Sequence, residues 1–129
     1  MSRKVKKVFV VFKTHFDIGY THLARELLEW YSGDMIRDVV KVCQATANAR
    51  KGKKYVWTVP AWPLKKTVEG IQDGELKSIV EKLIAERQLI WHGLPFTTHT
   101  EFCGMEELIR GLYIARELSV KYGQWAADA

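Results

Sequence analysis

Three short apolar runs, each closed by glycine or proline, constrain the fold of this chain most strongly. They cover Lys6–Lys13, Lys54–Val59 and Gln88–His92, and they are rich in β-branched and aromatic side chains. Such runs predict β-strands. Because helical segments separate them, the sequence predicts an α/β fold in which βα units build a parallel sheet.

Apolar residues at helical spacing fill the intervals between the predicted strands. A long helical region with a break at Ser32-Gly33 fills the first interval, and two shorter helices flank Asp73-Gly74 in the second. A last helix is predicted over Met105–Tyr122. Its predicted buried face consists of Leu108, Ile109, Leu112 and Ala115.

Composition narrows the class of protein. At 129 residues and 47% hydrophobic side chains, the chain suits one domain with a real core. The apolar run Val8–Phe12 is too short for a signal peptide or a membrane span, so we expect a cytoplasmic protein with no membrane partner. The net charge of +5 arises largely at Arg3–Lys7 and Arg50–Lys54, without interleaved aromatics, so no nucleic-acid partner is predicted.

The two cysteines support the same compartment. Cys43 falls in a predicted helix and Cys103 in a loop, without the paired spacing of a zinc knuckle or a disulfide framework. Free thiols of this kind fit a reducing compartment.

The carboxyl end of the first predicted strand carries a candidate metal pair. His15 and Asp17 are two residues apart, so their side chains point to the same side if the strand continues. An imidazole and a carboxylate are ligands for zinc or a similar divalent ion. The alternative is a histidine that is merely hydrogen-bonded to a nearby carboxylate.

Further polar and aromatic residues follow the same strand ends, where parallel sheets bind ligands. Tyr20 and Trp62 are either core residues or aromatic walls for a sugar ring. His99 and Glu101, in a loop rich in threonine, either form a polar loop tip or bind sugar hydroxyls. His92, at the end of the third run, is interpreted as structural.

The segment His15-Phe16-Asp17-Ile18-Gly19-Tyr20 resembles the opening motif of the glycoside hydrolase family 38 α-mannosidases, His-x-Asp-x-Gly-aromatic. The resemblance implies that residues 1–129 form the N-terminal portion of a glycoside hydrolase/deacetylase-type barrel, with the first three strands of a seven-stranded (β/α) barrel. It implies that His15 and Asp17 bind one zinc ion and that Tyr20 lines the sugar subsite. Glu101 corresponds loosely to an acidic residue after the third strand. The loop Leu94–Glu101 departs from the mannosidase pattern, which indicates a divergent branch.

The activity that the resemblance implies is zinc-dependent retaining hydrolysis of a glycoside by the complete protein. In that family the nucleophilic aspartate ends the fourth strand, and a further zinc histidine lies much later. No acid of this chain matches the nucleophile's motif, and residues 124–129 show no fourth strand. We therefore expect the chain alone to be inactive, with an exposed sheet edge that favours self-association.

Two other functions fit the same residues. One is a metal-dependent carbohydrate deacetylase, which a pair of histidines along one helix would favour; the chain has none. The other is a non-catalytic α/β domain that binds a sugar or a partner protein.

Overall fold

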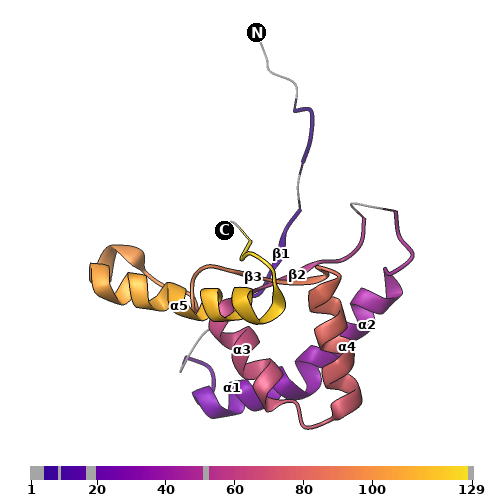
Figure 1. Cartoon of the computed structure of the whole chain (residues 1–129), viewed down its shortest axis with the longest axis horizontal. Helices are drawn as coiled ribbons and strands as arrows, with labels where there is room; N and C mark the ends of the chain where they lie inside the picture. The colour runs from indigo at the N-terminus through magenta and orange to yellow at the C-terminus, as the bar shows by residue number, and fades with distance from the viewer. Residues whose placement is uncertain (1–4, 9, 17–19, 51–52, 128–129) are drawn as a thin grey trace.

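A parallel sheet of three strands organises the molecule (Figure 1). The computed structural model describes residues 5–8, 10–16, 20–50 and 53–127. In chain order the elements are β1 (Phe12–Lys13), α1 (Ala24–Trp30), the π-helix η1 (Tyr31–Met35), α2 (Ile36–Ala45), β2 (Trp57–Pro60), α3 (Ala61–Gly70), α4 (Gly74–Ala85), β3 (Leu89–His92), the 3₁₀-helix η2 (Thr100–Phe102) and α5 (Met105–Tyr122). The strands lie in the order β1-β2-β3, and both neighbouring pairs are parallel. The predicted α/β class with a parallel sheet is confirmed.

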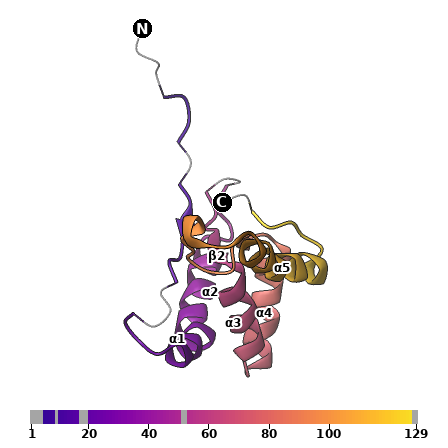
Figure 2. The same cartoon turned by 90° about the vertical axis from the view of Figure 1, so that its left-hand side faces the viewer.

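The helices α1 to α4 gather on one side of this sheet, as Figures 1 and 2 both show. Alternate strand residues, Trp57 and Val59 on β2 and Leu89 and Trp91 on β3, are buried in the shared core. The core side chains that the helices contribute include Ile36, Val40, Cys43, Leu64, Val80 and Ile84. Burying each large apolar side chain contributes roughly 1.5–3 kcal/mol, so this face of the sheet stabilises the fold.

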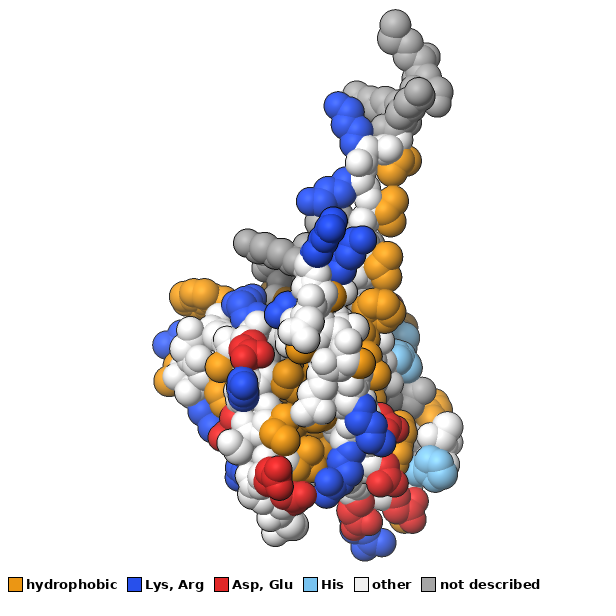
Figure 3. Space-filling model, turned by 90° about the vertical axis from the view of Figure 1, so that its right-hand side faces the viewer, with side chains coloured by type: hydrophobic (Ala, Val, Ile, Leu, Met, Phe, Trp, Pro, Cys, Tyr) orange, Lys and Arg blue, Asp and Glu red, His pale blue; other side chains and the backbone are white. Residues whose placement is uncertain are grey.

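The first strand is shorter than the sequence predicts. Instead of Lys6–Lys13, β1 spans only Phe12–Lys13. Val8, Val10 and Val11 are exposed on a segment that projects from the body, with hydrophobic side chains along one edge and lysines along the other (Figure 3). A strand needs a partner backbone, and β2 begins only at Trp57, the partner of Phe12. The apolar pattern is therefore present without the pairing that would make it a strand.

The predicted break near Ser32-Gly33 is a π-helical turn that joins α1 to α2 without a loop. The Ser32 hydroxyl donates to the Leu28 carbonyl at 2.8 Å. A Cβ atom at Gly70 would lie 2.9 Å from the Ser32 side chain, so glycine lets the end of α3 approach this turn closely.

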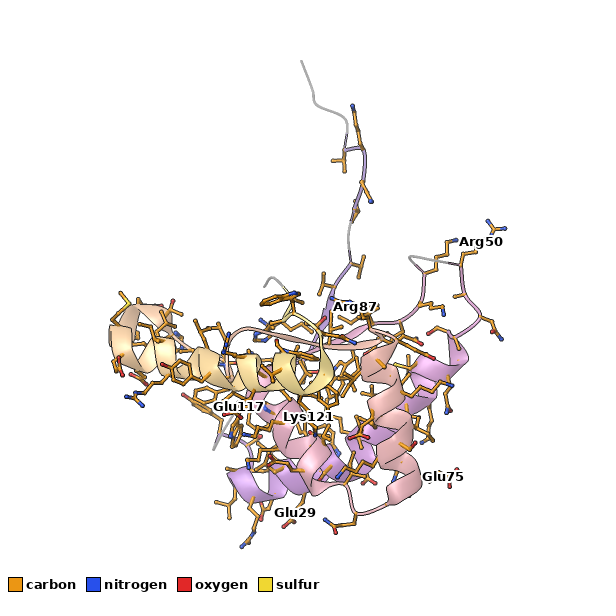
Figure 4. The ribbon with its side chains drawn as sticks, in the orientation of Figure 1. Glu29, Arg50, Glu75, Arg87, Glu117 and Lys121 are labelled. Atoms are coloured by element: carbon orange, nitrogen blue, oxygen red, sulfur yellow. The ribbon has the colours of Figure 1, made fainter. Side chains whose placement is uncertain are left out.

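Helix α5 has the predicted bounds but not the predicted buried face. Ala115 and Leu118 are buried, whereas Ile109 and Leu112 are 41% and 44% exposed. Figure 1 shows why: the first half of α5 extends beyond the sheet, and only its second half lies over α3. There Glu117 pairs with Lys65 of α3 at 2.5 Å, and Glu117 and Lys121 lie on the side of α5 that faces α3 (Figure 4).

The segment after α5 returns to the sheet. Gly123 ends the helix in a left-handed conformation, with φ of 64°. Ala127 then forms an isolated parallel bridge with His92, in which the Ala127 amide donates to the Trp91 carbonyl at 2.6 Å. Over residues 124–127 this contact is an isolated bridge along the outer edge of β3 and not a fourth strand.

Both cysteines are free, as predicted. Cys43 is buried in α2, and burial raises the pKa of its thiol to about 11, so it is a packing residue rather than a nucleophile. Within the ranges that the structure describes, no helix combines the length and apolarity needed to cross a membrane.

Candidate functional site

The sheet has a face that turns away from α1 to α4, and we call it the open face. The strand register places Lys13, Thr58 and Ile90 side by side, and the alternation of side chains puts this row opposite the buried face. Thr58 and Ile90 line a groove of about 940 Å³ on the amino-terminal half of the sheet. His92 is two residues beyond Ile90, so it lies on the same face at the carboxyl edge.

His15 reaches this carboxyl edge from β1. The Thr14 amide donates to the Thr58 carbonyl at 3.1 Å, which carries the parallel ladder one residue past Lys13. The Trp57 indole also donates to the Thr14 hydroxyl and fixes this residue over the core. Continued alternation places His15 level with Pro60 and His92, on the open face.

The loop after β3 is held against His15. Two amides at the start of α3, from Ala61 and Trp62, donate to the carbonyls of Leu94 and Pro95 at 3.1 and 2.9 Å. These amides belong to a helix N-terminus and have no partner within the helix, so the loop satisfies them. The Thr97 hydroxyl then lies 3.2 Å from Nδ1 of the His15 imidazole. The first and third predicted site segments therefore meet in space.

The second member of the predicted metal pair, Asp17, lies outside the described residues. His15 is exposed, with Thr97 beside Nδ1. In metal sites a ligating histidine is commonly oriented by an oxygen partner on one ring nitrogen and binds the ion through the other. The contact with Thr97 thus fits a histidine that binds zinc through Nε2. Among the described residues, no group of three or more His, Cys, Asp or Glu side chains is arranged to hold a metal ion.

Trp62 belongs to an aromatic cluster under the loop. Its ring packs edge-to-face against Phe16 at 5.8 Å and Phe96 at 6.3 Å between ring centroids. Phe16 in turn packs edge-to-face against the buried Tyr31 at 5.0 Å. Trp62 is half-buried, so its packing role is observed and part of its surface stays accessible.

The other predicted site residues lie on the surface. Tyr20 is 87% exposed, which rules out its core alternative. His99 and Glu101 are exposed and face each other, with 3.8 Å between Nδ1 and Oε1. His99 directly precedes the short helix η2, and Glu101 lies within it. They do not contact His15 through any interaction between described residues.

From the sequence alone, His92 is interpreted only as a structural residue. It is 2% exposed, and neither ring nitrogen has a hydrogen-bond partner among the described residues. Burial lowers the pKa of the His92 imidazole, and the positive charge of Lys13 lowers it further. The signal was present in the sequence, because His92 is the one polar residue in the run Leu89-Ile90-Trp91-His92.

The carboxyl edge therefore combines an oriented imidazole, a buried unpartnered imidazole, a lysine and a hydroxyl-rich loop. Of these groups, the exposed His15 imidazole is the one whose chemistry suits a metal ligand. No protein-family model, curated protein or solved structure matches the chain.

Proposed function

We propose that this chain is the N-terminal portion of a zinc-dependent retaining glycosidase of the family 38 type, with its three strands the first of a seven-stranded (β/α) barrel. The observation that carries the proposal is the contact between His15 and Thr97, which joins the motif after β1 to the loop after β3. The parallel order β1-β2-β3 supports it, because barrels of this type begin with sequential parallel strands. The free cysteines support a cytoplasmic location.

His15 and Asp17 would hold the zinc ion. When bound, zinc would act as a template for neighbouring sugar hydroxyls and stabilise negative charge. Thr97 orients the His15 ring for this role. The nucleophilic carboxylate of a retaining mechanism would come from outside residues 1–129, so the chain contributes one half of the site.

The remaining predicted residues would contact the sugar. The exposed ring of Tyr20 and the accessible part of Trp62 offer apolar faces against which a pyranose can stack. The exposed pair His99 and Glu101 offers a donor and an acceptor for hydroxyl groups.

Zinc affinity tests the proposal. We expect the wild-type chain to bind Zn²⁺ in competition with a chromophoric chelator, and His15→Ala to weaken binding by at least about tenfold, because loss of even a hydrogen-bond partner of a metal ligand has an effect of this size. His22→Ala removes another exposed imidazole close by and serves as the matched control with unchanged affinity. Equal affinity of the wild type and His15→Ala would contradict the zinc assignment.

A further inference from the structure

A cavity of about 750 Å³ lies along the side of α1. Its described walls are the side chains of Thr21, His22, Glu26, Leu27 and Trp30. Figures 1 and 2 show that α1 lies at the end of the helical layer remote from the sheet. Pockets that bind small molecules have volumes of this size, roughly 300–1,000 Å³. The cavity is therefore large enough for a small ligand, and the proposed zinc centre makes no use of it.

Trp30 supplies an aromatic surface to the cavity. Its side chain is 49% exposed, and its ring packs edge-to-face against Tyr31, with 5.6 Å between the ring centroids. Tyr31 is only 2% exposed and packs in turn against Phe16 in the core. The core thus supports the indole, while the accessible part of the ring lines the cavity and can contact a ligand.

Glu26 supplies a carboxylate one helical turn before Trp30. Residues four apart lie on the same face of a helix, and both of these side chains line the cavity. The Leu23 amide donates to Oε2 of Glu26 at 3.2 Å, which fixes the carboxylate beside the cavity. No described lysine or arginine forms an ion pair with this carboxylate, so Oε1 can accept hydrogen bonds from a ligand.

The remaining walls add hydrogen-bonding groups. The Thr21 hydroxyl and the His22 imidazole are exposed, and each can donate one hydrogen bond and accept another. An aromatic surface beside several donors and acceptors complements a pyranose ring, which has apolar C–H faces and a rim of hydroxyl groups. A cationic ligand matches less well, because it cannot accept from these donors and is usually held in a cage of several aromatic rings.

We propose that this cavity is a sugar-binding site, in which a pyranose ring stacks on Trp30 and its hydroxyls donate to Glu26. The site uses neither His15 nor the zinc ion, so it does not rest on the proposed function. In a glycosidase, such a site would hold part of an oligosaccharide away from the bond that is cleaved, and binding energy from remote parts of a substrate can assist the reaction.

NMR titration of the isotope-labelled full chain tests the site, because the indole N–H of each tryptophan gives its own signal. The probes are the methyl β-glycosides of glucose, galactose and mannose. Sorbitol is the control, because it has hydroxyl groups but no ring face. We expect at least one glycoside to shift the Trp30 signal in a saturable way and sorbitol to leave it unchanged. All titrations contain EDTA, so that no binding depends on zinc.

Variants locate the site. In Trp30→Ala, binding followed through the Leu27 amide should be at least about tenfold weaker, because the indole supplies most of the apolar contact. Glu26→Gln should weaken binding about threefold or more by removing a charge-assisted hydrogen bond, while glutamine keeps the helix cap. Trp125→Ala removes an indole that is 85% exposed and lies beyond α5, so this matched control should bind as the wild type does.

Several results would overturn the site: no shift with any of the glycosides, an equal shift with sorbitol, or unchanged affinity in Trp30→Ala. Tighter binding of tetramethylammonium than of every glycoside would replace the sugar by a cation. His15→Ala distinguishes this site from the zinc centre, because the variant should lose zinc affinity and keep the glycoside-induced shift of Trp30. Loss of the shift in His15→Ala would show that the sugar binds at the zinc centre instead.

Discussion

At the scale of single residues, His92 combines a polar side chain with almost complete burial. Burial lowers the pKa of its imidazole in the folded protein, and the positive charge of Lys13 lowers it further. In the unfolded chain the same group takes up a proton at its ordinary pKa. The unfolded state therefore binds more protons than the folded state as the pH falls below about 6.5.

We predict that His92 makes the fold less stable under mildly acidic conditions. The free energy of unfolding should be highest above the ordinary histidine pKa and should fall as the pH is lowered through the depressed pKa of the folded state. His92→Phe should flatten this dependence, whereas His22→Ala, at an exposed position, should leave it intact. Urea unfolding monitored by circular dichroism between pH 5 and 8, a range around the ordinary histidine pKa, measures the effect. Parallel curves for the wild type and His92→Phe would contradict it.

At the scale of elements, the start of α4 depends on one side chain. The Asp73 carboxylate accepts from the amides of Glu75 and Leu76 at 3.0 and 3.1 Å, and Arg37 of α2 donates to it at 3.3 Å. It therefore caps the helix and ties it to its neighbour.

We predict that Asp73→Ala lowers the urea midpoint of unfolding, while Asp73→Asn retains most of the stability because asparagine also caps helices. Asp38→Ala is the control: it removes an exposed ion pair with Lys41 and should change stability by no more than ~0.5 kcal/mol. A midpoint for Asp73→Ala equal to that of Asp38→Ala would show that the cap is unimportant.

Some helices and strands can be predicted from the sequence, and others cannot. Local periodicity and the glycine and proline signals predict where β2 and β3 end, after starts at Trp57 and Leu89, and they predict the bounds of α5. The length of β1 does not, because it depends on where a partner strand begins, 45 residues later at Trp57. The buried face of α5 does not either, because it depends on which half of the helix lies over α3.

The candidate site shows the same division. The period of two identifies His15 as a residue of the carboxyl edge, and its position there is observed. The partner that orients it, Thr97, lies 82 residues further along the chain, and only the fold brings the two together. The importance of His92 likewise depends on its burial and on Lys13, neither of which can be read from its neighbours in the sequence.

At the scale of the whole molecule, the helices α1 to α4 cover one face of the sheet, and the candidate site residue His15 lies at the carboxyl edge of the other face. The exposed apolar residues Val8, Val10 and Val11 line the same groove as Thr58 and Ile90 of this open face. Self-association through the sheet edge stays a prediction. Our central claim is that the metal ion binds at the carboxyl edge of the open face, next to His15 and Thr97.

NMR with paramagnetic Co²⁺ in place of Zn²⁺ tests that claim most directly, because the signals of nuclei near the ion shift or broaden. We predict that the signals of Thr97 and His92 change, that those of Lys54 and Arg87 at the opposite, amino-terminal side of the sheet do not, and that His15→Ala removes the effect. Unchanged Thr97 signals on Co²⁺ binding, or changes centred on Lys54 and Arg87, would contradict a metal site at the carboxyl edge.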